Sequence, residues 1–218
     1  MWQDEAAQSP RIISVSSSSK KTGKTTLSAF LIRELQADYA LKVCADHHVP
    51  PIIDDPEIIC KPGTDTGALV EAGARKVVWA SSGTDDGLAR VISKALELFP
   101  AHGIMVVESN SALKHISPDF AVFMMSVPFC EFKPSAFPAL AKADLVLLDM
   151  RRGLRGRDVD EIVSGLAEQA PEACVLSYAD QHGLREALRE TSHMAREAVS
   201  RPLVPSLLAG EGSTQQRG

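Results

Sequence analysis

A Gly-Lys-Thr-Thr sequence follows a short β-branched strand and a loop of small residues, and it constrains the fold more than any other feature of the chain. The strand is predicted from Ile12, Ile13 and Val15, the serine-rich loop covers 16–19, and a helix is predicted to begin at 23–26. Backbone N–H groups of such a loop and of the first helical turn lack partners and converge on one point, where the helix dipole adds positive potential. This strand–loop–helix unit is the context that a phosphate-binding loop requires.

The loop predicts specific roles for its residues. Lys24 is expected to reach the β- and γ-phosphates of a nucleotide, and the Thr25 hydroxyl to bind Mg²⁺. Ser18 stands where the usual pattern has glycine, so we expect some strain or a changed path there, because a Cβ obstructs certain torsions and close approaches. A helix that begins in this way only for capping is the alternative. The predicted nucleotide-binding residues are Ser19, Lys20, Lys21, Thr22, Gly23, Lys24, Thr25 and Thr26.

Two carboxylates are predicted to act beside the loop, each at the end of a strand. Glu108 would hold Mg²⁺ through water or orient an attacking water, with a capping or salt-bridging glutamate as the alternative. Asp46 would join the Mg²⁺ shell or act as a base. His47 and His48 follow it, but adjacent residues of an extended chain point in opposite directions, so at most one would face the phosphates. The predicted catalytic residues are Lys24, Asp46 and Glu108, and the predicted metal ligands are Thr25, Asp46 and Glu108.

Other polar residues lie near strand ends, where a substrate crevice is expected in an open parallel sheet. Asn110 and Asp149 are predicted to cluster there with Asp46, His47 and Glu108. Asp149 would read a base edge or cap the next helix, and the sequence favours neither. The Gly-Thr-Asp-Thr-Gly run at 63–67 is interpreted as a turn and a helix N-cap. The arginine-rich stretch at 151–157 would be a solvated loop or a clamp for an anionic substrate.

Strands and helices are predicted to alternate along the chain. Strands are expected at 12–15, 40–45, 58–60, 76–80, 103–108, 120–125, 144–149 and 173–177, and helices at 27–35, 68–72, 86–98, 134–142, 158–168 and 184–199. Runs of Val, Ile and Leu without alternation are typical of strands buried on both faces. The predicted fold is therefore α/β: a three-layer α/β/α, doubly wound, mostly parallel sheet of the P-loop NTPase type. Residues 1–201 are expected to form one domain and 202–218 a disordered tail.

Composition narrows the function classes. The chain has 218 residues, of which 44% are hydrophobic and 23% charged, as expected for one globular domain with a full core. A net charge of −5 argues against a nucleic-acid binder. The acidic N-terminal segment and the short apolar runs predict neither a signal peptide nor a membrane span. The cysteines have no paired spacing, so reduced cytoplasmic thiols are expected at Cys44, Cys60, Cys130 and Cys174.

The run from Ser18 to Leu27 resembles the Gly-x-Lys-x-Ser-Gly-Lys-Thr-Thr-Leu loop of molybdopterin-guanine dinucleotide biosynthesis protein B. Lys20 falls on the loop lysine of that family. The family's Val-Glu-Gly strand end is similar to Val107-Glu108 here, with Ser109 in place of glycine. The resemblance covers about the first 125 residues. It implies a GTP-binding protein that assists nucleotide attachment to molybdopterin. A broader similarity extends to dethiobiotin synthetase and the cobyrinic acid amidating enzymes, which use ATP to activate a carboxylate.

Three functional hypotheses follow. The first is an accessory protein of molybdenum cofactor biosynthesis that hydrolyses GTP or ATP with Mg²⁺ and works with a partner protein. The second is an ATP-dependent ligase or kinase that acts on a small acid. The third is an interaction module with a degenerate P-loop, which the serine at position 18 keeps open. Association as a homodimer is left open by the sequence, and the base of the nucleotide is not specified by it.

Overall fold

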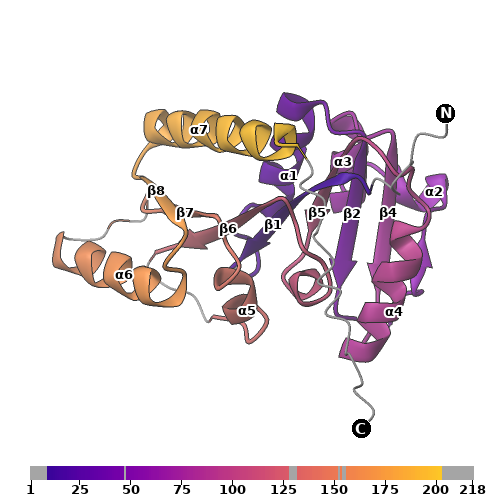
Figure 1. Ribbon diagram of the computed structural model, residues 1–218, viewed down its shortest axis with the longest axis horizontal. Coiled ribbons are helices and arrows are strands. Elements are labelled where there is room, and N and C mark those ends of the chain that lie inside the picture. The colour runs from indigo at the N-terminus through magenta and orange to yellow at the C-terminus, as the bar shows by residue number, and fades with distance from the viewer. Residues whose placement is uncertain (1–8, 47, 128–131, 152, 154–155, 203–218) are drawn as a thin grey trace, which may run out of the picture.

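The computed structural model describes residues 9–46, 48–127, 132–151, 153 and 156–202, which form an α/β fold around one sheet (Figure 1). The strands are β1 (Arg11–Ser17), β2 (Tyr39–Cys44), β3 (Ile52–Ile53), β4 (Lys76–Ser81), β5 (Ile104–Glu108), β6 (Phe120–Ser126), β7 (Leu145–Asp149) and β8 (Cys174–Tyr178). The helices are α1 (Lys24–Leu35), α2 (Pro56–Ile59), α3 (Asp65–Glu71), α4 (Asp85–Leu96), α5 (Ala136–Leu140), α6 (Gly156–Gln169) and α7 (Gln181–Ser200), with a 3₁₀ turn, η1 (Ser111–Lys114).

The sheet is doubly wound about strand β1. Its strand order is β3-β4-β2-β5-β1-β6-β7-β8, and every pairing is parallel except that of β3 with β4. Elements between β1 and β5 lie on one side of β1, and the later strands lie on the other. The connection from β1 leads to β2 on one side, and the connection from β5 crosses to β6 on the other, so the strand order reverses at β1. Folds of this type bind ligands at the carboxyl end of the strands where the order reverses.

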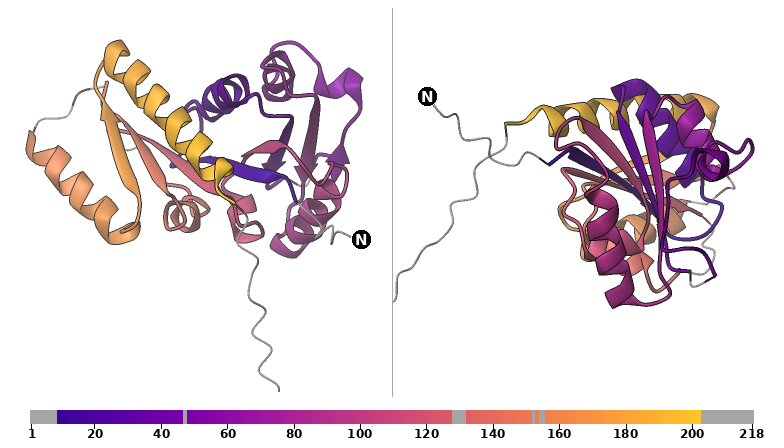
Figure 2. Two further views of the ribbon diagram at one scale, coloured as in Figure 1. Left: turned by 45° about the horizontal axis from the view of Figure 1, so that its top comes forward. Right: turned by 90° about the vertical axis from the view of Figure 1, so that its right-hand side faces the viewer.

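Helices cover both faces of the sheet and complete three layers (Figures 1 and 2). Helices α1, α3 and α7 pack on one face, where Ile13 and Val15 of β1 join their core cluster. On the other face, α4 and η1 pack over β2, β4 and β5, while α5 and α6 pack over β6 and β7. Apolar side chains thus leave the strands in both directions, as a parallel sheet covered on both faces requires.

The predicted three-layer fold with a mostly parallel sheet is confirmed, with one error in the element order. The segment 58–60 was expected to be a strand, but it contains the end of helix α2. The Asp55 side chain accepts a hydrogen bond from the Glu57 backbone N–H, and Pro56 occupies the first turn. These helix start signals outweigh the strand preference of the β-branched pair of isoleucines, so the segment is helical. The strand in this region is instead the short antiparallel β3, before the helix.

Most of the predicted tail, 203–218, lies outside the described residues. Helix α7 is the last described element, and it packs against α1, β1, β6 and β8. No helix in the described part of the chain combines the length and apolar character that crossing a bilayer requires.

Candidate nucleotide-binding site

The loop between β1 and α1 presents uncapped backbone N–H groups. Gly23 is the N-cap of α1 and has a φ of 94°, a left-handed conformation that favours glycine. No side chain caps this helix, whereas Thr84 caps α4 and Asp180 caps α7 through side-chain oxygens. The first turn of α1 also contains no acidic residue. The first-turn N–H groups of α1 therefore have no side-chain cap, and neither they nor the positive end of the helix dipole is compensated by a side chain of the helix start.

Ser18 fits the loop without the torsion that would require glycine. Among the described non-glycine residues, only Lys21 and Gln36 have positive φ. The backbone N–H of Ser18 donates to the Met124 carbonyl at 2.9 Å, and its carbonyl accepts from the Lys133 N–H at 3.2 Å. The expected backbone strain is therefore absent at this serine. The torsional argument for the third hypothesis, a degenerate loop, is therefore not supported at Ser18.

The predicted nucleotide-binding residues lie together around this loop. Lys24 Nζ donates to Ser17 Oγ at 2.8 Å. Burial lowers the pKa of Lys24, nearby Lys133 and Lys42 lower it further, and the Glu108 carboxylate opposes them. A desolvated ammonium at this position has lost much of its hydration and would be favoured by added negative charge. Of the other predicted residues, Lys20, Lys21 and Thr26 are exposed, and the Thr22 hydroxyl donates to the carbonyl of Ser19.

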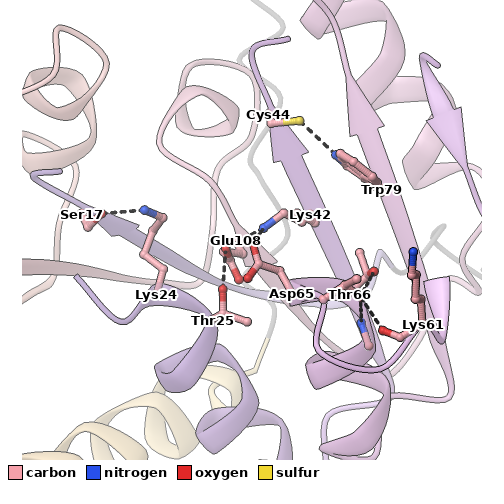
Figure 3. A network of polar contacts seen from close by, with 12 residues as sticks. Ser17, Lys24, Thr25, Lys42, Cys44, Lys61, Asp65, Thr66, Trp79 and Glu108 are labelled. Atoms are coloured by element: carbon pink, nitrogen blue, oxygen red, sulfur yellow. Dashed lines mark hydrogen bonds and ion pairs between the residues drawn. The ribbon is translucent and has the colours of Figure 1, made fainter. Parts of the chain in front are cut away.

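Thr25 and Glu108 meet at the centre of the site (Figure 3). Thr25 Oγ1 donates to Glu108 Oε1 at 3.1 Å. Glu108 ends β5, the strand next to β1, and is only 5% exposed. Its second oxygen, Oε2, is buried and accepts no hydrogen bond from the described residues. A buried acceptor beside a hydroxyl and a carboxylate oxygen fits Mg²⁺, which prefers oxygen ligands and retains water.

Two further charged residues, Lys42 and Asp65, complete this cluster, and neither was predicted from the sequence to belong to the site. Lys42 Nζ lies 3.0 Å from Glu108 Oε1 and 2.6 Å from Asp65 Oδ2. The hydrogen bond from Lys42 lowers the pKa of Asp65 against a smaller effect of burial, and Thr25 and Lys24 lower it further. Asp65 therefore stays ionised near the loop. The available signal for Lys42 was its position as the single charge in an otherwise uncharged strand.

Asp65 lies in the segment 63–67, which the sequence predicts correctly as a turn and helix N-cap but not as part of the site. Thr64 caps helix α3, since its hydroxyl accepts from the Gly67 N–H at 3.1 Å, which confirms the turn and N-cap predicted at 63–67. The same turn places Asp65 in the first turn of α3 and brings its carboxylate to Lys42 (Figure 3). A capping sequence and a site residue are therefore combined in one motif.

Asp46 is not part of this hydrogen-bonded cluster. It follows β2, and its Oδ1 accepts from the His48 backbone N–H at 2.8 Å, while its carbonyl accepts from the Ser81 hydroxyl. The Asp46 carboxylate is therefore bound to the backbone two residues further along the chain. His47 lies outside the described residues. No group of three or more His, Cys, Asp or Glu side chains is arranged to hold a metal in the part of the chain that the structure describes.

Asn110 lies at the loop, as predicted, and its role there is to fix the backbone. Its Oδ1 accepts from the Ser17 N–H at 2.9 Å, and its Nδ2 donates to the Ser17 carbonyl at 2.6 Å. The amide therefore satisfies both backbone groups of the residue at which β1 passes into the loop. This pairing ties the loop to the segment after β5, directly beyond Glu108.

Asp149 lies at the end of β7, on the other side of β1, and is held by Arg151. Arg151 donates from Nε to Oδ1 at 2.9 Å and from Nη2 to Oδ2 at 2.6 Å. The guanidinium also lies 5.4 Å from the ring centroid of Tyr178. The structure thus pairs both carboxylate oxygens locally and does not bring Asp149 into the cluster around Thr25. Of the other arginines in this stretch, Arg152 and Arg155 lie outside the described residues.

Comparison with solved structures finds similar chains, among them three of which one has a TM-score above 0.5. Hydrogenase maturation factor HypB from Archaeoglobus fulgidus has a TM-score of 0.54 and 14% identity, and the match covers 85% of this chain and 90% of that one. An ATP complex of Cyanothece McdA has a TM-score of 0.49 and 11% identity over 90% of this chain and 99% of the other. HypB from Helicobacter pylori in complex with nickel has a TM-score of 0.43 and 17% identity over 88% and 90%.

At these identities the likeness concerns the fold alone. No family model and no curated protein matches the chain. The fold, taken with the geometry of the β1–α1 loop, defines a protein with a P-loop NTPase-like architecture.

Proposed function

We propose that this protein binds a nucleoside triphosphate with Mg²⁺ at the β1–α1 loop and hydrolyses it. One observation carries the proposal: the 3.1 Å hydrogen bond from Thr25 to Glu108, which joins the first turn of α1 to the end of the neighbouring strand. A hydroxyl beside the phosphate-binding turn and a buried carboxylate on the adjacent strand form the pair that phosphoryl-transfer sites of this class use.

Each residue has a defined task in this proposal. The uncapped N–H groups of α1 and the Lys24 ammonium bind the phosphates, and the exposed Lys20 and Lys21 add positive charge at the rim. Thr25 and Glu108 would hold Mg²⁺, which neutralises charge that develops on the phosphate oxygens. The buried Oε2 of Glu108 accepts no hydrogen bond from the described residues, and it would accept one from the attacking water and orient it.

The finer proposal is that GTP is the nucleotide and that its turnover assists nucleotide attachment to molybdopterin. Its support is the resemblance of the loop, from Ser18 to Leu27, to that of molybdopterin-guanine dinucleotide biosynthesis protein B. A partner protein of cofactor biosynthesis, a cytoplasmic location and self-association belong to the same proposal. The thiols of Cys44, Cys60 and Cys174 are free, as that location requires.

Thermal unfolding with Mg²⁺ and GTP, ATP or no nucleotide tests this function. A ligand at a hundredfold excess over its Kd stabilises the folded state by about 2.7 kcal/mol, and GTP should stabilise more than ATP. Lys24→Ala should abolish the nucleotide effect and leave the melting temperature without nucleotide nearly unchanged. Lys94→Ala is the matched control, because Lys94 is an exposed lysine on α4.

The proposal is wrong if neither nucleotide raises the melting temperature, or if Lys24→Ala responds like the wild type. A stronger response to ATP than to GTP would leave nucleotide hydrolysis in place but overturn the finer proposal. Phosphate release by the wild type, measured with and without Mg²⁺, separates hydrolysis from binding.

A further inference from the structure

The lysine in strand β2, Lys42, occupies an energetically unfavourable position for a charged side chain. Lys42 is the one charged residue in the strand sequence, and its side chain is 16% exposed. In the parallel ladder it stands opposite Glu108 of β5 on one side and Trp79 of β4 on the other. Facing residues of neighbouring strands project from the same face of a sheet. An ammonium at such a place destabilises the fold unless negative partners compensate its lost hydration.

Both of its partners belong to the proposed nucleotide site. Lys42 Nζ donates to Asp65 Oδ2 and to Glu108 Oε1, and the latter oxygen also accepts from Thr25. Burial lowers the pKa of Lys42, but the Glu108 and Asp65 carboxylates outweigh burial and raise it, so the ammonium stays charged. The Lys42 charge therefore shares one oxygen with the hydroxyl that would bind Mg²⁺.

We propose that Lys42 is a positioning residue of this site: its ammonium holds the Glu108 and Asp65 carboxylates beside Thr25, and it limits the affinity of the site for divalent cations. The inference rests on the proposed nucleotide binding. Two opposite consequences follow from the position of the charge. The ammonium offsets repulsion between the carboxylates and an incoming triphosphate, and it competes with Mg²⁺ for Glu108 Oε1.

Lys42→Met separates these two effects, because Met keeps the length of the stem and removes the charge. Mg²⁺ is titrated into protein that holds a fixed concentration of a non-hydrolysable GTP analogue, and the melting temperature is followed. The half-saturating Mg²⁺ concentration should fall about tenfold, since a like charge beside the cation is removed. In EDTA, the same variant should bind the analogue more weakly than the wild type. A merely structural lysine would not move these readouts in opposite directions.

Two variants serve as controls. Lys42→Arg keeps the charge and should retain the wild-type Mg²⁺ dependence. Lys76→Met makes the same substitution on the neighbouring strand β4, where the lysine binds the Leu98 carbonyl instead of the site, and it should change neither readout.

Loss of Lys42 leaves two carboxylates without their shared cation, so the single variant is also made in an Asp65→Asn background. The Asp65 side chain is exposed. The Asn substitution removes its negative charge, so only the Glu108 carboxylate is left without a cation when Lys42 is replaced. Lys42→Met should again lower the half-saturating Mg²⁺ concentration relative to Asp65→Asn alone. An unchanged or raised value in both backgrounds overturns the inference. A wild type that shows no nucleotide-dependent stabilisation overturns the proposed function instead, and with it this role.

Discussion

The two flanks of strand β1 place polar side chains at the same edge of the sheet but pair them differently. On the β5–β2 flank, Glu108 binds Thr25 across 83 residues and Lys42 across 66. On the β6–β7 flank, Asp149 binds Arg151 across only 2 residues. The first set of contacts exists only when the whole sheet is assembled. The pairing of Asp149 with Arg151 is formed within a single turn, and Tyr178 of strand β8 adds a longer-range contact to it.

This difference suggests separate roles for the two flanks, one in ligand chemistry and one in structural support. The β5–β2 flank buries charge at an energetic cost, because a buried carboxylate oxygen without a partner is unfavourable, and the proposed nucleotide site would give that oxygen a partner. The β6–β7 flank supports the loop through two backbone hydrogen bonds of Ser18, whose N–H donates to the Met124 carbonyl and whose carbonyl accepts from the Lys133 N–H. We therefore expect chemistry to depend on the first flank and structural support on the second.

The largest effect is expected from Glu108→Gln. The amide has the same shape and can still accept from Thr25, so nucleotide binding should persist. Turnover should fall by on the order of a thousandfold, because an amide is a poor acceptor for the proton of the attacking water. Single-turnover phosphate release measures the loss. Asp149→Asn, on the opposite flank, should leave turnover unchanged, and a comparable loss in that variant would contradict the division.

The second effect concerns Tyr178, at the end of the structural flank. Burial, together with the negative charge of Asp149, raises the pKa of Tyr178 to about 12 from 10.0. The unfolded chain releases this proton first, so the stabilisation is complete below pH 10 and is lost as the pH rises to about 12. Denaturant unfolding at pH 9 and at higher pH should show a steeper loss in the wild type than in Tyr178→Phe. Equal slopes would show that the phenol ionises alike in both states.

Sequence patterns were sufficient to nominate the local residues of the candidate site. Lys24 and Thr25 lie in one contiguous loop, and Glu108 ends an apolar run, so each could be identified without the sheet order. The roles of Lys42 and Asp65 depend on β2 lying beside β5 and on α3 beginning next to it, which no spacing in the sequence reveals. Long-range pairing of this kind is a property of topology rather than of periodicity.

For Asp46, the sequence predicted the position along the chain but not the contacts of the side chain. Its place at the end of β2 was foreseen, but the direction of its side chain is set by a local contact with the His48 N–H. Short polar side chains readily bond to the backbone two residues on, which competes with longer-range partners. Its predicted role as a metal ligand and catalytic residue stays a prediction, and it can be tested against Asp65.

A third experiment compares Asp65→Asn with Asp46→Asn. Removing the charge that contacts Lys42 near Thr25 should raise the half-saturating Mg²⁺ concentration about tenfold, because one attractive charge is lost. Asp46→Asn should leave it at the wild-type value, since that carboxylate closes its own turn. The assay is the Mg²⁺ titration of melting temperature with a bound analogue. The reverse ranking would restore Asp46 to the metal site and remove Asp65 from it.

The smallest effect is expected at the far end of the structural flank, where Asp149→Ala tests base recognition. A guanine-reading aspartate accepts hydrogen bonds from the base, and its loss would weaken GTP binding far more than ATP binding. Both oxygens of Asp149 already accept from Arg151, so the ratio of the two affinities should change by less than about threefold, below the cost of one lost hydrogen bond to a charged group. Competitive displacement of a fluorescent nucleotide measures both affinities. A selective loss of GTP binding would show that Arg151 releases the carboxylate to the base, and the two flanks would then share recognition.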